Sequence, residues 1–189
     1  MQNFSLHNEY KERYLRELSR RNEIIASLAM PNSIVAALFS ATLYLVSRLH
    51  LPFILIDYMQ LCLLGAALIC LLFAVYKVVR ALIGYENASE PTPFALEKWR
   101  QDLYAYYVAE NITISDQEIE KEVLNYLYGE YAKNAELNAK NNEERMIHLN
   151  WANRSILISF VFIAFCATIN VAVSFSTPAT VYDVRVIDK

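Results

Sequence analysis

The feature that most limits how this chain can fold is a long proline-free run, residues 115–175, which is polar in its first half and apolar in its second. Its opening residues, Ser115 to Glu118, form a capping box, in which the serine satisfies a free backbone N–H and the glutamate reaches back. The apolar part, 152–175, exceeds the roughly 20 residues that a bilayer core requires. The run therefore predicts one long helix, or two stacked end to end, that leaves an aqueous compartment and enters a membrane.

Two further apolar segments, 32–49 and 53–83, are also long enough to cross a bilayer. Pro31 precedes the first of them, and proline is well placed in a first helical turn because its missing donor costs nothing there. Residues 84–93 contain prolines, Asn and Ser and predict a linker, after which Pro93 begins another helix. The chain is therefore expected to be all-α: an integral membrane helical bundle with three transmembrane helices and a cytoplasmic helical insert.

The distribution of Lys and Arg predicts the orientation of these segments. Basic residues are frequent before residue 30 and between Lys77 and Arg154, and sparse around Arg48, His50 and Pro52 and in the tail, which favours a cytoplasmic amino end. The expected domains are a cytoplasmic amphipathic helix (1–30), a transmembrane hairpin (31–84), a cytoplasmic helical region (85–151), a third transmembrane helix (152–176) and an extracytoplasmic tail (177–189).

Composition excludes several functional classes. Hydrophobic residues make up 56% of the 189 and charged residues 20%, in separate stretches, so little chain is left for an enzyme core. The net charge of −3 gives no overall nucleic-acid signature. The cysteines lie in apolar runs, the histidines would be divided by the membrane, and three glycines form no phosphate loop. We expect no enzyme, no cofactor and no metal. The cysteines are Cys62, Cys70 and Cys166, and the histidines are His7, His50 and His148.

Small residues recur every four positions on the second span, at Cys62, Ala66, Cys70 and Ala74. Such a seam permits close approach of a neighbouring helix, and packing is the function we expect of it.

The third span carries a polar stripe, and polar side chains in lipid are costly unless they face protein or water. Its serines and Asn170 have two interpretations: hydrogen bonds between helices or back to their own turn, or the lining of a pore. In a pore, Phe162 or Ile163 would form a hydrophobic constriction that gates by dewetting. The candidate pore and gate residues are Ser155, Ser159, Phe162, Ile163, Cys166 and Asn170.

A second stripe precedes the span at heptad-like spacing. A buried Asn in a helix seam fixes register, and three in succession favour an assembly with a hydrated interior, whereas a solvated surface is the other interpretation. In an assembly they would form a vestibule leading to the membrane. The candidate vestibule residues are Asn134, Asn138, Asn141, Arg145 and His148.

Cationic and aromatic side chains on the cytoplasmic side could hold phosphates and stack bases. The alternative is that they anchor the chain at the membrane interface and form a helical core, and the acidic central region argues against a purely electrostatic clamp. The candidate ligand-binding residues are Arg13, Arg16, Arg20, Arg21, Trp99, Arg100, Lys121 and Lys133.

The layout resembles that of small membrane effectors of bacterial antiphage defence. The features that carry the resemblance are the amphipathic first helix, the closely spaced pair of spans, the helical insert and the approach to the last span, with Tyr131, Ala132, Asn138, Arg145, Trp151 and Arg154. Within that group the chain looks most like the Hailong-type effector, whose partner nucleotidyltransferase makes an oligodeoxyadenylate signal. The resemblance covers most of the chain and concerns organisation more than any single motif.

What the resemblance implies is a homo-oligomeric channel, with a tetramer as one expected form, in the lipid of the bacterial inner membrane. The channel would be held shut by the bound oligonucleotide and opened when infection removes it, which depolarises the host. The other function that the sequence supports is a non-conducting membrane scaffold that docks a cytosolic partner through its helical insert.

Overall fold

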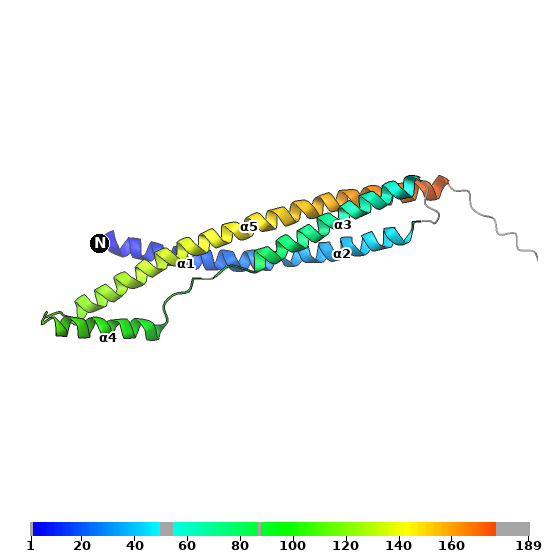
Figure 1. Ribbon diagram of the computed structural model, residues 1–189. Coiled ribbons are helices and arrows are strands. Elements are labelled where there is room, and N and C mark those ends of the chain that lie inside the picture. Colours follow the sequence, from blue (N-terminus) through cyan, green and yellow to red (C-terminus); the bar gives the residue numbers. More distant parts are fainter. Residues whose placement is uncertain (1, 50–54, 87, 177–189) are drawn as a thin grey trace, which may run out of the picture. The chain divides into compact units, whose positions relative to one another are not determined.

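The computed structural model describes residues 2–49, 55–86 and 88–176, and within these ranges the chain is entirely helical apart from turns and the linker. The helices are α1 (Gln2–Ser27), α2 (Ala29–Ser47), α3 (Leu55–Leu82), α4 (Pro93–Ala109) and α5 (Asp116–Ser176) (Figure 1). The predicted all-α class is confirmed. The predicted turn at His50 and Pro52 and the predicted tail 177–189 lie outside the described residues.

Helix α5 is a single helix of 61 residues, which resolves the choice between one helix and two stacked ones. Its predicted capping box is confirmed: the Ser115 N–H donates to the Glu118 carboxylate at 3.0 Å, and the Glu118 N–H donates to Ser115 Oγ at 3.4 Å. The same carboxylate lies near the positive end of the helix, and its hydrogen bonds with Ser115 lower the pKa of Glu118.

The turn before α5 ends α4 by a left-handed residue. Asn111 has φ of 53°, a conformation that Asn adopts more readily than most residues. It lets the Ile112 N–H donate to the Tyr107 carbonyl at 3.0 Å, which satisfies one of the free carbonyls of the last turn.

Among the described residues, three helical segments are long and apolar enough to cross a membrane: Leu6–Ser47, which covers most of α1 and all of α2, Leu55–Leu82, and Asp116–Phe175. Their most apolar windows have mean hydropathies of 1.8, 2.4 and 2.5. These helices support a membrane protein with several spans. Pro31 and Pro93 lie in the first turns of α2 and α4, as expected. Thr92 caps α4 by accepting from the Ala95 N–H at 3.2 Å.

The chain divides into two units. Unit 1 comprises Met1–Ala29 and Lys77–Asn150, and unit 2 comprises Met30–Tyr76 and Trp151–Lys189. Helices α3 and α5 each contribute residues to both units. We describe each unit by itself.

Unit 2 contains the apolar helices, which pack around one core. The buried core residues are Leu38 and Leu45 of α2, Leu64, Ala67, Leu71 and Ala74 of α3, and Ile156, Ile163 and Cys166 of α5. The predicted small-residue seam on α3 is displaced: Ala74 is buried, but Cys62 is exposed. The small residue that packs in its place is Ala67, because the face that meets α5 is rotated toward Leu64 and Leu71.

Unit 1 is built by packing α1 against the first half of α5. Tyr14 of α1 is buried with Tyr131 and Ala135 of α5, and His7 stacks on Tyr128 with 4.0 Å between ring centroids.

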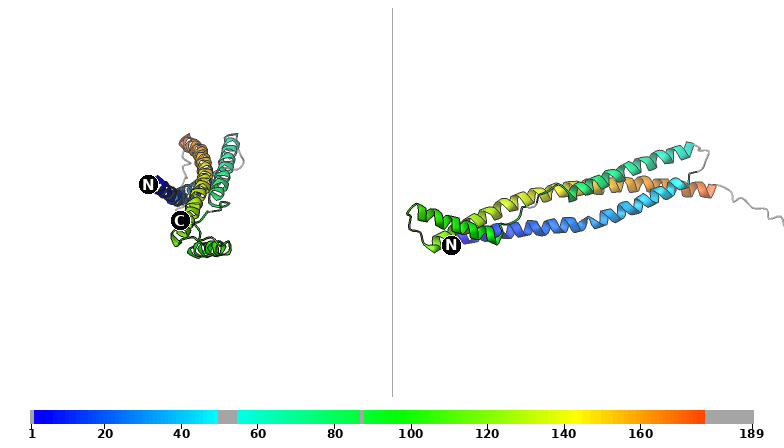
Figure 2. Two further views of the ribbon diagram at one scale, coloured as in Figure 1. Left: turned by 90° about the vertical axis from the view of Figure 1, so that its left-hand side faces the viewer. Right: turned by 60° about the horizontal axis from the view of Figure 1, so that its bottom comes forward.

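Helix α4 lies beside the beginning of α5 in both views of Figure 2. The Tyr107 hydroxyl donates to Glu122 at 2.7 Å, and the rings of Trp99 and Tyr126 lie 5.4 Å apart. Within Pro93–Ala109 no residue is fully buried, so the rest of unit 1 covers α4 only partly.

The tight contact at Ala67 generates a stability prediction. Replacing Ala67 by Leu adds side-chain volume to a fully buried position beside α5, and overpacking of this kind costs about 1–3 kcal/mol. We expect a lower thermal unfolding midpoint in detergent, measured by circular dichroism. Gly65→Leu is the matched control, because a side chain at Gly65 begins in open space. Equal destabilisation by both substitutions would contradict the described α3–α5 packing.

Candidate functional site

A row of asparagines on α5 holds the linker between α3 and α4. The Nδ2 groups of Asn134, Asn138 and Asn141 donate to the carbonyls of Ser89, Ala88 and Glu86 at 2.9, 3.1 and 2.7 Å. Asn138 also accepts from the Ala88 N–H at 3.2 Å. Spacings of four and three residues put these side chains on one helix face. We call the three asparagines the asparagine ladder.

The far end of the linker is fixed by two tyrosines. The Glu90 N–H donates to the Tyr14 hydroxyl at 3.1 Å, and the Tyr131 hydroxyl donates to the Glu90 carboxylate at 3.0 Å. Burial and this acidic acceptor raise the pKa of Tyr131 to about 12, so its phenol stays protonated at physiological pH and keeps donating. The linker is thus bound by α1 and α5 together.

One turn further along α5, Asn142 joins α5 to α1. It is only 1% exposed, and its Nδ2 donates to both the backbone carbonyl and the carboxylate of Glu17, at 2.8 and 3.1 Å. Its Oδ1 accepts from Arg145 Nη1 at 3.2 Å. Glu17 is also buried, and its Oε2 lies 3.7 Å from Arg20 Nη1.

Around Arg145 several cationic or protonatable side chains from three helices gather. Arg145 is 3% exposed, and its guanidinium carbon lies 4.8 Å from the centre of the Tyr85 ring. Burial lowers the pKa of Arg145, and repulsion from Arg21 lowers it further. Burial likewise lowers the pKa of His148, with repulsion from Lys77 and Arg80. We call Arg21, Lys77, Arg80, Arg145 and His148 the basic cluster.

The candidate vestibule residues therefore all lie in unit 1, where they divide into two groups. The ladder asparagines contact the linker, and Asn134 and Asn138 are only 5% and 4% exposed, so these two do not belong to a solvated surface. Arg145 and His148 belong to the basic cluster. A hydrated vestibule stays a prediction about an assembly of several copies.

The candidate pore residues lie in unit 2. Ser155 bonds back to the Trp151 carbonyl of its own turn at 3.0 Å, whereas Ser159 donates to the Ala67 carbonyl of α3 at 3.1 Å. The thiol of Cys166 lies 3.9 Å from the Gln60 carbonyl. Both modes of polar satisfaction weighed for this stripe thus occur in the chain.

The candidate gate residues and Asn170 complete the stripe. Ile163 is part of the buried core of unit 2, and Phe162 packs against this core. Asn170 differs from the serines, since its Nδ2 is enclosed and has no hydrogen-bond partner among the residues that the structure describes. Lining of a pore by this stripe stays a prediction.

The candidate ligand-binding residues are dispersed. Arg13 and Arg16 are exposed on α1, Arg20 pairs with Glu17, and Lys133 lies 3.9 Å from Glu130. Arg100 makes two bonds to Glu97, at 2.8 and 3.0 Å, which lower the pKa of that carboxyl, and Trp99 contacts Tyr126. Of the eight, Arg21 alone is in the basic cluster.

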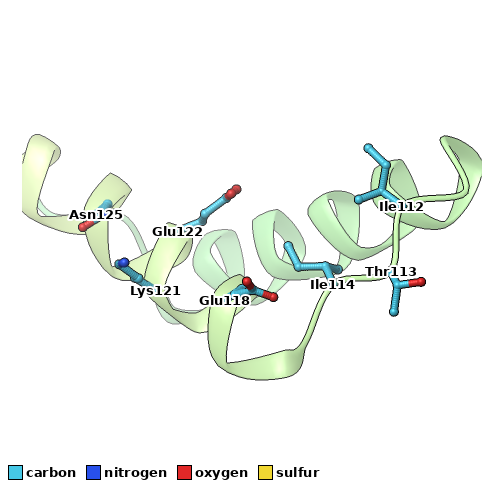
Figure 3. Close-up of a pocket in the computed structure, with 7 residues that line it drawn as sticks. All are labelled: Ile112, Thr113, Ile114, Glu118, Lys121, Glu122 and Asn125. Carbon is cyan, nitrogen blue, oxygen red and sulfur yellow. The ribbon is translucent and has the colours of Figure 1, made fainter.

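Lys121 lines an open hollow beside the turn that precedes α5. Figure 3 shows its lining residues: Ile112, Thr113, Ile114, Glu118, Lys121, Glu122 and Asn125. Its two carboxylates outnumber the single lysine, and Glu122 already accepts from Tyr107. The hollow is therefore poorly suited to an anionic ligand.

Sequence reasoning missed several residues that build these sites. The sequence did not show that the linker carbonyls accept hydrogen bonds from the asparagines. It also did not group Arg145 with Glu17, Lys77, Arg80 and Asn142. A signal for Asn142 was present, because 134, 138 and 142 are spaced by four residues.

The ladder generates a prediction at Asn138, which makes two bonds to Ala88. Asn138→Ala leaves a part-buried N–H and carbonyl of the linker unsatisfied, which should destabilise unit 1 by about 1–3 kcal/mol. We expect faster proteolysis within residues 84–92 and a lower unfolding midpoint. Asn125→Ala, at an exposed position of the same helix, is the control. Unchanged protease resistance of the linker would show that the ladder does not hold it.

The basic cluster generates a prediction about pH. The pKa of His148 in the folded chain lies below its ordinary value of 6.5, because burial, Lys77 and Arg80 outweigh the attraction of Glu144. Above about pH 6.5 His148 is neutral in both the folded and the unfolded chain and does not affect the free energy of unfolding. As the pH falls through that value toward the lowered pKa, the unfolded chain takes up the proton first, and the folded chain loses stability.

The measurement is the unfolding midpoint between about pH 7.5 and 5.5. His148→Gln should lose less stability over this interval than the unsubstituted chain. Identical pH dependence in the His148→Gln variant would refute the lowered pKa.

Comparison with protein-family models, with curated proteins and with solved structures finds no match to this chain. The resemblance to Hailong-type effectors therefore stays a prediction. The features from which a function can be inferred are the asparagine ladder, the basic cluster and the apolar spans.

Proposed function

We propose that this chain is a membrane effector of antiphage defence, whose copies assemble into an ion-conducting pore in the bacterial inner membrane. In this proposal unit 1 is cytoplasmic and receives an oligonucleotide signal, and pore opening depolarises the cell. The carboxyl end lies outside the cytoplasm.

The observation that carries the proposal is the continuity of α5. The same unbroken helix bears the asparagine ladder in unit 1 and the polar stripe of the third span in unit 2. A packed helix responds to a displacement by shifting or rotating between discrete arrangements instead of deforming gradually. A ligand that moves the ladder or the basic cluster can thereby bias the third span.

The third span contains a polar group that suits an assembly. An amide in the hydrocarbon region is expensive unless it meets protein or water. The enclosed Nδ2 of Asn170 finds no acceptor within the described part of the chain. A neighbouring copy or a water-filled axis would supply that acceptor.

The spans also leave most of their surface available. Between 22% and 28% of the residues in the three apolar windows are buried within one chain. Exposed apolar side chains such as Leu157, Phe160 and Phe165 can meet lipid or another copy. In the closed state that we propose, Ser159, Ile163 and Cys166 keep their contacts with α3, and opening turns this stripe toward the shared axis.

A substitution at Ile163 tests the gate. Ile163→Ser makes a hydrophobic constriction easier to wet, and it weakens the core contact that holds the stripe toward α3. We expect ion leak from liposomes that contain the purified protein, without any added oligonucleotide, and slower growth of cells that express the variant.

Leu157→Ser is the matched control, because it introduces the same side chain at a position of the same helix that is 63% exposed. Circular dichroism and native mass spectrometry would verify that both variants remain helical and associated. The unsubstituted chain would be assayed with and without oligodeoxyadenylates of several lengths. Liposomes that stay tight under all these conditions would exclude conduction.

The second candidate function is a non-conducting scaffold that docks a cytosolic partner. A specific observation favours it: α4 buries no residue completely and exposes Phe94, Trp99, Tyr104 and Tyr106. Aromatic side chains of this kind are enriched at protein interfaces. Absence of flux together with a monomeric state in native mass spectrometry would favour the scaffold over the pore.

A further inference from the structure

The basic cluster differs from the other charged groups of unit 1 in its burial and its origin. Three separate helices contribute to it: Arg21 comes from α1, Lys77 and Arg80 from the last turns of α3, and Arg145 and His148 from α5. Arg145 is buried, Arg21, Lys77 and His148 are half-buried, and Arg80 is exposed. Arg13 and Arg16, by contrast, are exposed and solvated.

The members of the cluster are close enough to repel one another. Arg21 lowers the pKa of Arg145, and Lys77 and Arg80 lower that of His148. Tyr85 connects the two subsets, since both Arg80 and Arg145 act electrostatically on its phenol and the Arg145 guanidinium lies over its ring. Arg21, Lys77, Arg80 and Arg145 therefore give this region of unit 1 positive charge, and His148 lies among them.

Glu144 and Glu17 bring negative charge near the cluster. Glu144 acts on both His148 and Tyr85, and it is exposed. Glu17 is connected to Arg145 through Asn142, and its carboxylate also lies 3.7 Å from Arg20 Nη1.

Two nitrogens of the cluster also have unused hydrogen-bonding capacity. Arg21 Nε and His148 Nδ1 are enclosed, and neither has a hydrogen-bond partner among the residues that the structure describes. Buried polar atoms are nearly always satisfied in native proteins, so an unsatisfied pair in one positive region calls for a missing partner.

We propose that the basic cluster is a binding site for a phosphate group, held by Arg21, Arg145 and His148 with Lys77 and Arg80 at its margin. A phosphate supplies several acceptor oxygens and negative charge, which suits unsatisfied nitrogens and mutual repulsion at once. Arginine in particular presents planar donors that match phosphate oxygens.

The phosphate can come from a lipid headgroup or from a soluble phosphate compound. Lys77, Arg80 and His148 each lie a few residues from the apolar part of a candidate span, the position at which basic side chains meet lipid headgroups. An oligonucleotide carries the same group. This inference goes beyond the proposed pore, because phosphate binding requires no conduction.

The experiment uses the purified full-length chain and three phosphate sources. Inorganic pyrophosphate and a short oligodeoxyadenylate would be titrated against the protein in neutral detergent by calorimetry. Retention of phosphatidylglycerol against phosphatidylcholine would be measured by native mass spectrometry from mixed nanodiscs. Arg21→Gln should weaken binding of the true source about tenfold or more, as expected for loss of one charge-assisted contact.

Arg16→Gln is the matched control, because it removes the same charge from an exposed position of α1. His148→Gln provides a second variant in case Arg21→Gln perturbs α1. Without phosphate, Arg21→Gln should raise the unfolding midpoint, since it relieves repulsion in the cluster. A purely structural arginine would lower that midpoint.

The outcomes separate the alternatives. Binding of one source that is lost in Arg21→Gln and kept in Arg16→Gln supports the site and identifies its ligand. Absence of binding for all three sources, or equal weakening by the two arginine variants, overturns it. Liposomes that conduct no ions would contradict the pore and leave this result unaffected.

Discussion

Hydrogen bonds between side-chain amides and backbone carbonyls hold unit 1 in its arrangement. A linker without regular structure cannot satisfy its own N–H and carbonyl groups, and burial of such a segment is costly unless partners are supplied. The asparagine ladder supplies them at spacings that match the helix period. Tyr14 and Tyr131 complete the set at Glu90. The end of α3 and the start of α4 are thereby fixed against α5. This also fixes Arg80, a member of the basic cluster, and Tyr85, whose ring contacts Arg145.

The same physical rule explains the different behaviour of polar groups in unit 2. Apolar surroundings offer no water, so Ser155 bonds to its own turn and Ser159 to the backbone of α3. Each of these serines is satisfied within one chain and gives no reason to invoke another copy. Asn170 is the exception among the described polar residues of the stripe, because its enclosed Nδ2 has no hydrogen-bond partner there. The case for assembly therefore depends on Asn170 more than on the serines.

The sequence predicted local features well and long-range pairings poorly. The capping box at Ser115, the proline in the first turn of α4 and the unbroken α5 follow from interactions over a few residues, which a sequence displays directly. Asn138 was recognised as unusual, but its partner Ala88 is 50 positions away, and nothing in the linker indicates which helix it binds. The displaced seam on α3 has the same origin. Several faces of an apolar helix can accept a neighbour, and only tertiary packing selects Ala67 over Cys62.

The basic cluster and the buried network beside it illustrate opposite uses of polar burial. Asn142 satisfies Glu17 and Arg145 together, so this part of the α1–α5 contact is a completed network that specifies how the two helices pack. Arg21 and His148, one turn further along their helices, retain enclosed nitrogens that the described residues do not satisfy. A site that served stability alone would gain from an acidic or apolar residue at either position, because burying repelling cations is unfavourable. Their presence is therefore better explained by a ligand than by folding, and a phosphate is the group whose charge and acceptors match what is missing.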